Sequence, residues 1–320
     1  MSATAEAPAA RGASVAAQNK ARSDKKKTDR QEGWRRRGPL LPALIFAIIV
    51  TQLPFVFTLF YSLQSWNLVR PGSRQFVGLS NYADVFGDRV FRGAALNTIL
   101  ITGGCVLISL LIGLALAMLL DRPFPGRGLA RTLLITPFLV MPVAGALLWK
   151  TTMFDPTFGI VNWVLAPFGA GQTDWISRFP LAAIIIALVW QWTPFMMLLL
   201  LAGLQSQDRS SLEAAAVDGA GPYQMFVSIT LPHMRRYIEL SVLLGAIYVV
   251  NTFDHIYMMT SGGPGTASAN LPFYIYQRAF LGFDIGQAAA MGVVVVVGTI
   301  IVATFALRLI FKSFTAEASS

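Results

Sequence analysis

The sequence predicts an all-α polytopic membrane protein with six transmembrane helices. Of its 320 residues, 55% are hydrophobic and 13% are charged, whereas a soluble domain has about 25% charged residues. Apolar runs of about 20 residues, the length that crosses a bilayer, recur along the chain. Basic residues cluster outside these runs, with ten of the 25 Lys and Arg in the first 37 residues.

Six apolar runs are long enough to be spans. They cover residues 40–62, 94–120, 133–153, 181–204, 237–260 and 288–310. Pro137 and Pro142 fall inside the third run, and Pro194 falls inside the fourth. Prolines are tolerated in transmembrane helices because neighbouring helices re-satisfy the freed backbone groups. We therefore expect six helices, with kinks in the third and the fourth.

The distribution of basic residues sets the orientation of these helices. With both termini in the cytoplasm, 18 Lys and Arg lie in inner segments and six in outer segments, as the positive-inside rule requires. Residues 1–37 are too polar to bury a core, so we expect a disordered basic tail that touches anionic lipid headgroups. The net charge of +9 therefore does not indicate nucleic-acid binding. The transmembrane domain is 38–312, and 313–320 form a short cytoplasmic tail.

Motifs for catalysis are absent from the sequence. It holds no G-x-x-x-x-G-K-[ST], H-E-x-x-H, G-x-S-x-G or C-x-x-C, so it lacks a P-loop and the commonest hydrolase and redox motifs. With two His and one Cys, it does not indicate a metal centre. We expect no catalytic residue and no cofactor in this chain. Energy for any transport must then come from a partner or an ion gradient.

The fourth and fifth expected spans are joined by a polar stretch, residues 205–236, which we call the coupling loop. Ser210 and Glu213 have the spacing of a capping box, so a helix is expected to begin at Ser210 or Ser211. Gly219 tolerates positive φ and supplies a stop. Pro222 is acceptable in a first helical turn and restarts a helix. The orientation above places this helix–turn–helix in the cytoplasm.

The coupling loop resembles the EAA loop of permease subunits in bacterial binding-protein-dependent ABC importers. That pattern reads E-A-A, two residues, D-G-A, then an aromatic residue, an isoleucine and L-P. It is matched here by Glu213, Ala214, Ala215, Asp218, Gly219, Ala220, Phe226, Ile229, Leu231 and Pro232. The resemblance implies the type I importer permease fold, a location in the bacterial inner membrane, and ATPase coupling through Glu213–Ala215 and Asp218–Ala220. The Leu231-Pro232 pair is expected to turn the chain out of helix before the fifth span.

Polar and aromatic side chains recur inside the fifth expected span. Asn251, Asp254 and His255 lie three or four residues apart, near the helical face that also carries Tyr248. With Phe253, they form a stripe that suits a sugar, whose hydroxyls need hydrogen bonds and whose ring packs on aromatic faces. We take these five residues as candidates for the substrate path. A polar seam that packs against a second subunit is the alternative explanation.

Two further segments resemble sugar-type permeases of the same superfamily. Phe76–Tyr82 is similar to their F-x-G-L-x-N-Y segment, and 253–264, which ends in a Gly-Gly-Pro turn, is similar to permeases related to the maltose F-subunit. Residues 271–290 resemble the corresponding stretch of permeases for polyols and small sugars. The resemblance implies these partners: a homologous second permease subunit, an ATPase dimer that binds ATP and Mg, an extracytoplasmic solute-binding protein and a sugar or polyol.

Two other functions remain compatible with the sequence. Asp254 and His255 could relay protons in an ion-coupled secondary transporter, because His titrates near physiological pH. The chain could also be a membrane scaffold without transport activity. Asn97 and Gln191 are further polar residues inside spans, and each is more often an interhelix hydrogen bond than a substrate contact. Co-purification with an ATPase dimer would support only the importer.

Overall fold

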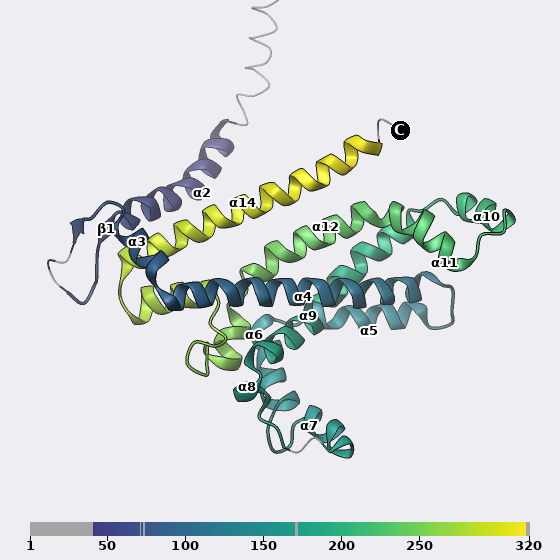
Figure 1. Cartoon of the computed structure of the whole chain (residues 1–320), viewed down its shortest axis with the longest axis horizontal. Helices are drawn as coiled ribbons and strands as arrows, with labels where there is room; N and C mark the ends of the chain where they lie inside the picture. The colour runs from purple at the N-terminus through teal and green to yellow at the C-terminus, as the bar shows by residue number, and fades with distance from the viewer. Residues whose placement is uncertain (1–40, 71, 73, 170–171, 318–320) are drawn as a thin grey trace, which may run out of the picture. The chain divides into compact units, whose positions relative to one another are not determined.

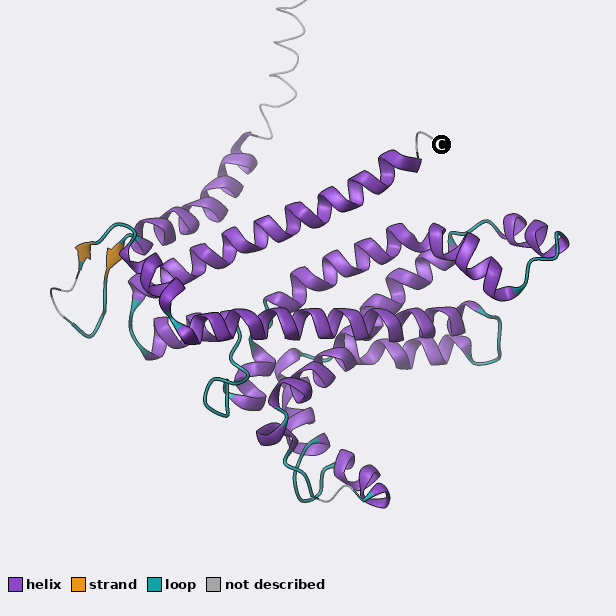
Figure 2. Cartoon of the chain, viewed as in Figure 1, coloured by secondary structure: helices purple, strands orange, loops and turns teal. Residues whose placement is uncertain are grey.

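The computed structural model describes residues 41–70, 72, 74–169 and 172–317. The expected basic tail, residues 1–37, lies outside the described residues. The chain divides into two units, Met1–Phe60 and Tyr61–Ser320. The first unit holds most of helix α2 (Leu41–Ser62), which is predominantly apolar. Figures 1 and 2 follow the chain from α2 to α14 (Ile285–Glu317) and show that almost all of its regular structure is helical.

Among the described residues, three helices are long and apolar enough to cross a membrane. They are α2, α4 (Arg89–Asp121) and α9 (Pro180–Gln205), which match the first, second and fourth expected spans. A bent pair, α5 (Arg127–Leu139) and α6 (Pro142–Leu148) with its π-helical extension η2 (Trp149–Met153), is a further candidate. The total of six spans therefore stays a prediction.

The third expected span is broken rather than merely kinked. Its two halves meet at 98° around Val140 and Met141. Pro142 begins the second half, where its missing N–H costs nothing. The Val140 carbonyl accepts a hydrogen bond from Gln191 Nε2 at 2.9 Å. A side chain of α9 therefore supplies a hydrogen-bond partner for a backbone carbonyl at the bend. In contrast, α9 runs through Pro194 as one helix.

The centre of the second unit is a helix bundle. Helix α4 packs along α9, α12 (Leu231–Val250) contacts both of them, and α5 lies against α9 (Figure 1). At Gly113 of α4, an added Cβ would lie 3.0 Å from the Met196 Cβ of α9, which shows how closely the two backbones approach. One buried cluster of this bundle consists of Ala117, Leu120, Met197, Leu200, Leu201 and Met234.

The fifth expected span is also interrupted. Helix α12 ends at Val250, and the chain turns through residues 251–253 before a short π-helical segment, η5 (Ile256–Thr260). The Thr252 carbonyl, which the turn removes from the helix, accepts from Asn270 Nδ2 at 2.5 Å. A distant side chain thus stabilises a break that helical periodicity does not reveal. The expected Gly-Gly-Pro turn follows, with φ of +80° at Gly262.

Short elements connect the longer helices (Figure 2). Strands β1 (Gln64–Ser65) and β2 (Gln75–Phe76) pair antiparallel and lead into α3 (Ser80–Gly87). Between η2 and α9 lie α7 (Ile160–Leu165), the 3₁₀ turn η3 (Ala166–Phe168) and α8 (Trp175–Arg178). The last connection holds α13 (Leu271–Tyr276) and η6 (Gln277–Leu281).

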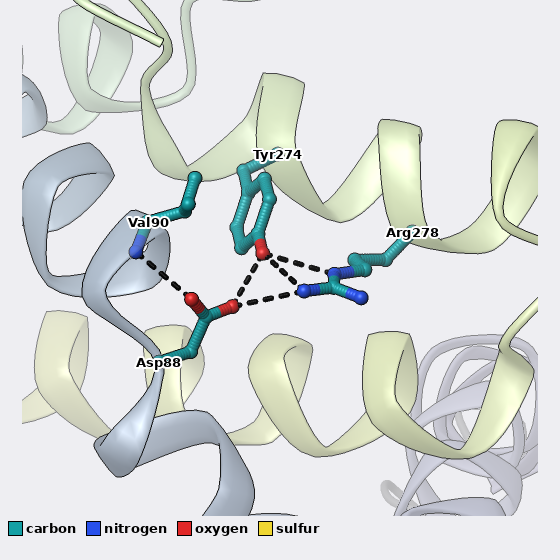
Figure 3. A network of polar contacts seen from close by, with 4 residues as sticks. All are labelled: Asp88, Val90, Tyr274 and Arg278. Atoms are coloured by element: carbon teal, nitrogen blue, oxygen red, sulfur yellow. Dashed lines mark hydrogen bonds and ion pairs between the residues drawn. The ribbon is translucent and has the colours of Figure 1, made fainter.

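A polar network ties this last connection to the start of α4 (Figure 3). Asp88 caps α4 by accepting from the Val90 amide at 2.8 Å. Its other carboxylate oxygen accepts from the Tyr274 hydroxyl and from Arg278 Nη2, the latter at 3.0 Å. Burial raises the pKa of Asp88, but hydrogen bonds from Tyr274, the Val90 amide and Arg278, with the charge of Arg278, hold that pKa below its usual value.

Candidate functional site

The first half of the coupling loop is a short, well-exposed helix. Helix α10 (Arg209–Val217) begins one residue before the expected start, because Asp208 is its N-cap. The Asp208 carboxylate accepts from the Ser210 amide at 3.0 Å and from the Ser210 hydroxyl at 2.8 Å. The prediction of a Ser210–Glu213 capping box was therefore wrong. Both bonds lower the pKa of Asp208, the hydroxyl bond more strongly.

The turn after α10 has the expected geometry. The amides of Asp218, Gly219 and Ala220 donate to carbonyls of the last turn of α10, at 2.9–3.2 Å. Gly219 has a φ of +87°, a left-handed conformation that strains residues with a side chain. A Cβ added there would meet nothing within 4 Å. Glycine is thus required by the backbone conformation and not by lack of space.

The second half of the coupling loop runs directly into α12. Helix α11 (Pro222–Met225) starts at the expected proline and continues through a π-helical turn, η4 (Phe226–Thr230). In that turn the Leu231 amide donates to the Phe226 carbonyl, five residues back. Pro232 then occupies the first turn of α12, so the expected break at Leu231-Pro232 is absent. The register shift of a π turn lets the chain pass a proline without leaving the helix.

A shallow cleft separates the two halves of this helix–turn–helix. Its volume is about 280 Å³. Its lining comes from the end of α10, the glycine turn and the first turns of α11 and η4: Ala215, Asp218, Gly219, Ala220, Gln224, Met225, Ser228 and Ile229. Glu213 and Ala214 are exposed on α10 and do not line the cleft. The exposed surface therefore combines alanines, which allow close approach, with the two carboxylates of Glu213 and Asp218.

The five candidates for the substrate path do not share one helical face. Tyr248 lies on α12, but Asn251, Asp254 and His255 follow the end of that helix at Val250. Tyr248 is 54% exposed. Asn251 is exposed, and its Nδ2 donates to the Ile247 carbonyl of its own helix at 2.7 Å. The expected stripe was therefore wrong as a geometric feature.

The other three candidates differ in their surroundings. Phe253 is half-buried among aromatic rings, stacked on Tyr257 at 5.4 Å between centroids. Asp254 is partly exposed, with no hydrogen bond or ion pair among the described residues. His255 is 2% exposed, and its Nε2 has no hydrogen-bond partner in the part of the chain that the structure describes. His255 thus belongs to the protein interior and Phe253 is only half-buried, whereas Tyr248 and Asn251 offer accessible surface.

An aromatic platform around Tyr248 was missed at the sequence level. Tyr248 stacks on Trp192 of α9, with centroids 5.4 Å apart, and meets Phe195 edge-on at 6.1 Å. Phe138 of α5 packs against both Trp192 and Phe195. The signal that could have revealed it is the Trp-Gln-Trp segment of α9, in which Gln191 has a different role, because its side chain donates to the Val140 carbonyl at the α5–α6 bend.

Asn97, the second additional candidate, is also a structural residue. Its Nδ2 donates to the carbonyls of Ala267 and Ala269 at 3.0 and 2.9 Å. It therefore holds the connection after η5 against α4. Within the described residues, no group of three or more His, Cys, Asp or Glu could hold a metal ion.

Comparison with known proteins agrees with the pattern in the coupling loop. Residues 109–315 match the family model described as binding-protein-dependent transport system inner membrane component. The sulfoquinovosyl glycerol transport system permease SmoG of Agrobacterium fabrum is 35% identical over 298 residues, which cover 90% of this chain and 96% of the relative. The trehalose/maltose permease MalF of Thermococcus litoralis is 34% identical over 256 residues, covering 79% and 86%.

A solved structure shows the same fold. The chain is similar to one in the crystal structure of a bacterial ABC transporter that imports the acidic polysaccharide alginate. The TM-score is 0.75 at 22% identity, and the alignment covers 89% of this chain and 98% of the other. At this identity the likeness shows the fold alone.

Proposed function

Because the chain belongs to the family of binding-protein-dependent transport system inner membrane components, we propose that it is the transmembrane subunit of an ATP-driven importer for sugars or polyols. Membership places it in the inner membrane and makes it a transporter component rather than an enzyme. It would form half of the translocation path, the other half coming from a homologous subunit. The observation that carries the coupling role is the exposed, capped helix α10, closed by the left-handed Gly219.

The coupling role assigns ATP and Mg to a partner ATPase dimer. Helix α10 would enter a groove on that ATPase, with its alanines allowing close approach and Glu213 facing a cation. Ala214, Ala215, Asp218 and Ala220 complete the docking surface, and Gly219 shapes the turn behind it. Closure of the ATPase dimer would move α10, and the spans would alternate between inward-open and outward-open states.

The substrate class is supported by relatives and by surface chemistry. The two relatives above are named for trehalose or maltose and for a sulfoquinovosyl glycerol. Tyr248, stacked on Trp192 and more than half exposed, offers an aromatic face that a sugar ring can cover. Asn251 is the nearest exposed amide along the chain. Phe253, Asp254 and His255, which follow the end of α12, would support the wall of the substrate path.

A solute-binding protein outside the cell would deliver the substrate. One solved relative of the fold is an alginate transporter in complex with a periplasmic protein that carries an alginate pentasaccharide. The orientation that suits this delivery has both termini and the coupling loop in the cytoplasm, with six spans in the domain of residues 38–312. Labelling of single cysteines in intact cells tests it: a cysteine at Ser228 should react only after permeabilisation.

Co-purification and vesicle uptake test the function directly. We expect a nucleotide-binding dimer to purify with the wild-type chain and uptake to require ATP. Glu213→Ala should weaken retention of the dimer, and Glu213→Gln, which keeps the shape, shows how much of the loss comes from charge. Uptake driven by an ion gradient without ATP or partner proteins would overturn the proposal and favour proton relay through Asp254 and His255.

The substrate path has its own test. Tyr248→Ala and Asn251→Ala should raise the substrate concentration needed for half-maximal uptake, because each removes an accessible contact. Tyr248→Phe keeps the ring and is the matched control, which should stay near wild type if stacking is the main contact. If apparent affinity and specificity are unchanged in all of these variants, the residues only pack and the assignment fails.

A further inference from the structure

A polar cluster joins the two ends of the coupling loop. Ser206, just after α9, contacts the Tyr237 hydroxyl at 2.8 Å and His233 Nε2 at 3.1 Å. Both partners lie on the first turns of α12. Ser206 Oγ also donates to the Gly203 carbonyl at 2.8 Å, and His233 Nε2 lies 3.2 Å from the same carbonyl. Four residues that enter and leave the coupling loop therefore share one network.

The hydrogen-bond roles within this cluster are determined by the Gly203 carbonyl. A carbonyl only accepts, so Nε2 carries the proton of His233 and donates to Gly203 or to Ser206. Ser206 donates to Gly203, which leaves its oxygen free to accept from Tyr237 and His233. Every donor finds an acceptor, and the cluster satisfies the Gly203 carbonyl at the C-terminal end of α9.

Tight packing surrounds the polar cluster. A Cβ added at Gly203 would lie 2.6 Å from Cγ of Tyr237 and 2.9 Å from Sδ of Met234. The Tyr237 ring thus lies directly against the α9 backbone, and only glycine permits this approach. Met234 is fully buried and belongs to the hydrophobic cluster that it forms with residues of α4 and α9. The ends of α9 and α12 therefore meet without a gap.

The helix that is proposed to dock has a different environment. In α10, Val217 is 88% exposed and no residue is buried. Helix α10 packs against α11, and the chain joins it to α9 through residues 206–208. A force on α10 therefore reaches the bundle through the two ends of the loop, and both ends enter the cluster at Ser206 and His233.

We propose that Ser206, His233 and Tyr237 form a clasp that makes α9 and α12 follow the coupling loop as one body. The three are positioning residues, and the inference depends on the proposed coupling function. Without the clasp, the ends of α9 and α12 could separate, and part of the motion of α10 would be lost in bending the loop. The expected consequence is wasted ATP hydrolysis rather than weaker docking.

Transport per ATP in reconstituted vesicles tests the clasp. The variants are Ser206→Ala, Tyr237→Phe and His233→Ala in the complete importer. Each should retain the ATPase at the wild-type level while substrate transported per ATP hydrolysed falls about fivefold, the scale of a modest coupling free energy. Ser206→Thr and His233→Gln retain hydrogen-bonding groups and should recover most of the ratio.

Two controls separate the clasp from general effects. Thr136→Val removes a hydroxyl on α5 that, in the part of the chain that the structure describes, bonds only to the Thr132 carbonyl of its own helix, and it should leave the ratio unchanged. The double variant Ser206→Ala with Tyr237→Phe should be no worse than Ser206→Ala alone, because Ser206→Ala already removes the contact between Ser206 and Tyr237.

The outcomes are distinguishable. A wild-type ratio in Ser206→Ala and Tyr237→Phe would overturn the clasp and leave the importer intact. Loss of ATPase binding in the same variants would also overturn it, because the clasp is assigned to transmission and not to docking. Absence of ATP-dependent uptake in the wild type would instead defeat the proposed function.

Discussion

The coupling loop and the segment of residues 251–282 are both irregular connections, yet different forces hold them. In the coupling loop, Asp208, Gly219 and Pro222 act on residues within one or two turns of themselves. Its best-exposed helix, α10, has no buried residue. The segment 251–282 is instead held by Asn97 of α4 and by Asp88, the N-cap of that helix.

The difference shows how each region responds to its surroundings. A locally determined element keeps its shape when its neighbours move, which suits a docking helix. A segment held from a distance moves with the helix that holds it, and Asn97 and Asp88 both tie this segment to α4. The loop after η5 and the N-terminal part of α4 should therefore behave as one body, and the following variants test that contrast.

Asn270→Leu should have the largest effect on stability. Asn270 is 1% exposed, and it both donates to the Thr252 carbonyl and accepts from the Phe273 amide. The change leaves the buried Phe273 amide and the partly buried Thr252 carbonyl without this partner and should cost about 3 kcal/mol. Thermal unfolding in detergent measures it. The same change at exposed Asn251 is the control and should stay within about 0.5 kcal/mol. Equal losses at both positions would contradict the contrast.

Gly219→Val should have the next largest effect, and this effect should be a loss of coupling to the ATPase. Forcing a side chain into the left-handed conformation costs about 1–2 kcal/mol, so the docking geometry should become about tenfold less populated. Retention of the ATPase and ATP-dependent uptake measure this loss. Gly219→Asn is the matched control, because Asn tolerates this conformation. If Val and Asn behave alike, backbone strain is not the reason for the glycine.

The Asp88 network should make the stability of the fold depend on pH. The pKa of Asp88 is held below its ordinary value of 3.8, so the network stabilises the fold above that value. The stabilisation is lost as pH falls through the lower pKa of the folded state. The wild type should therefore lose melting temperature on acidification below about pH 4 more steeply than Asp88→Asn. Parallel profiles for the two proteins would show that the network adds nothing.

The smallest effect is expected for Asp208→Ala. This change removes the cap of an exposed helix, so only α10 should loosen and the global melting temperature should hardly change. Faster amide hydrogen exchange in residues 209–217 is the measurement. Asp208→Ser keeps a capping oxygen and should exchange like the wild type. A large fall in global stability would mean that α10 is not a locally determined element.

Some elements of the site were predictable because their causes are local. The stop at Gly219 and the restart at Pro222 follow from backbone properties of those two residues, and both were found as expected. The cap was misplaced because Asp208 and Ser210 both offer oxygens at suitable positions, and the stronger acceptor took the role. The break expected at Pro232 is absent because a π turn accommodates the proline.

Other parts depended on residues far away in the chain. The stripe from Tyr248 to His255 assumed a continuous helix, but α12 ends at Val250 because Asn270 supplies the hydrogen bond that the turn at Thr252 needs. Likewise, the span that contains Pro142 breaks where the Gln191 side chain donates a hydrogen bond to the Val140 carbonyl. Pro194, in contrast, lies inside a continuous helix.

The sequence by itself determined the membrane character, the family pattern and the helix–turn–helix of the coupling loop. These follow from composition and from interactions within a turn or two, which a chain carries wherever it folds. Only the tertiary structure decided where spans break, that Tyr248 lies on Trp192, and that Ser206 meets Tyr237. In the apolar interior a freed backbone group must find a partner, and packing decides which distant side chain supplies it.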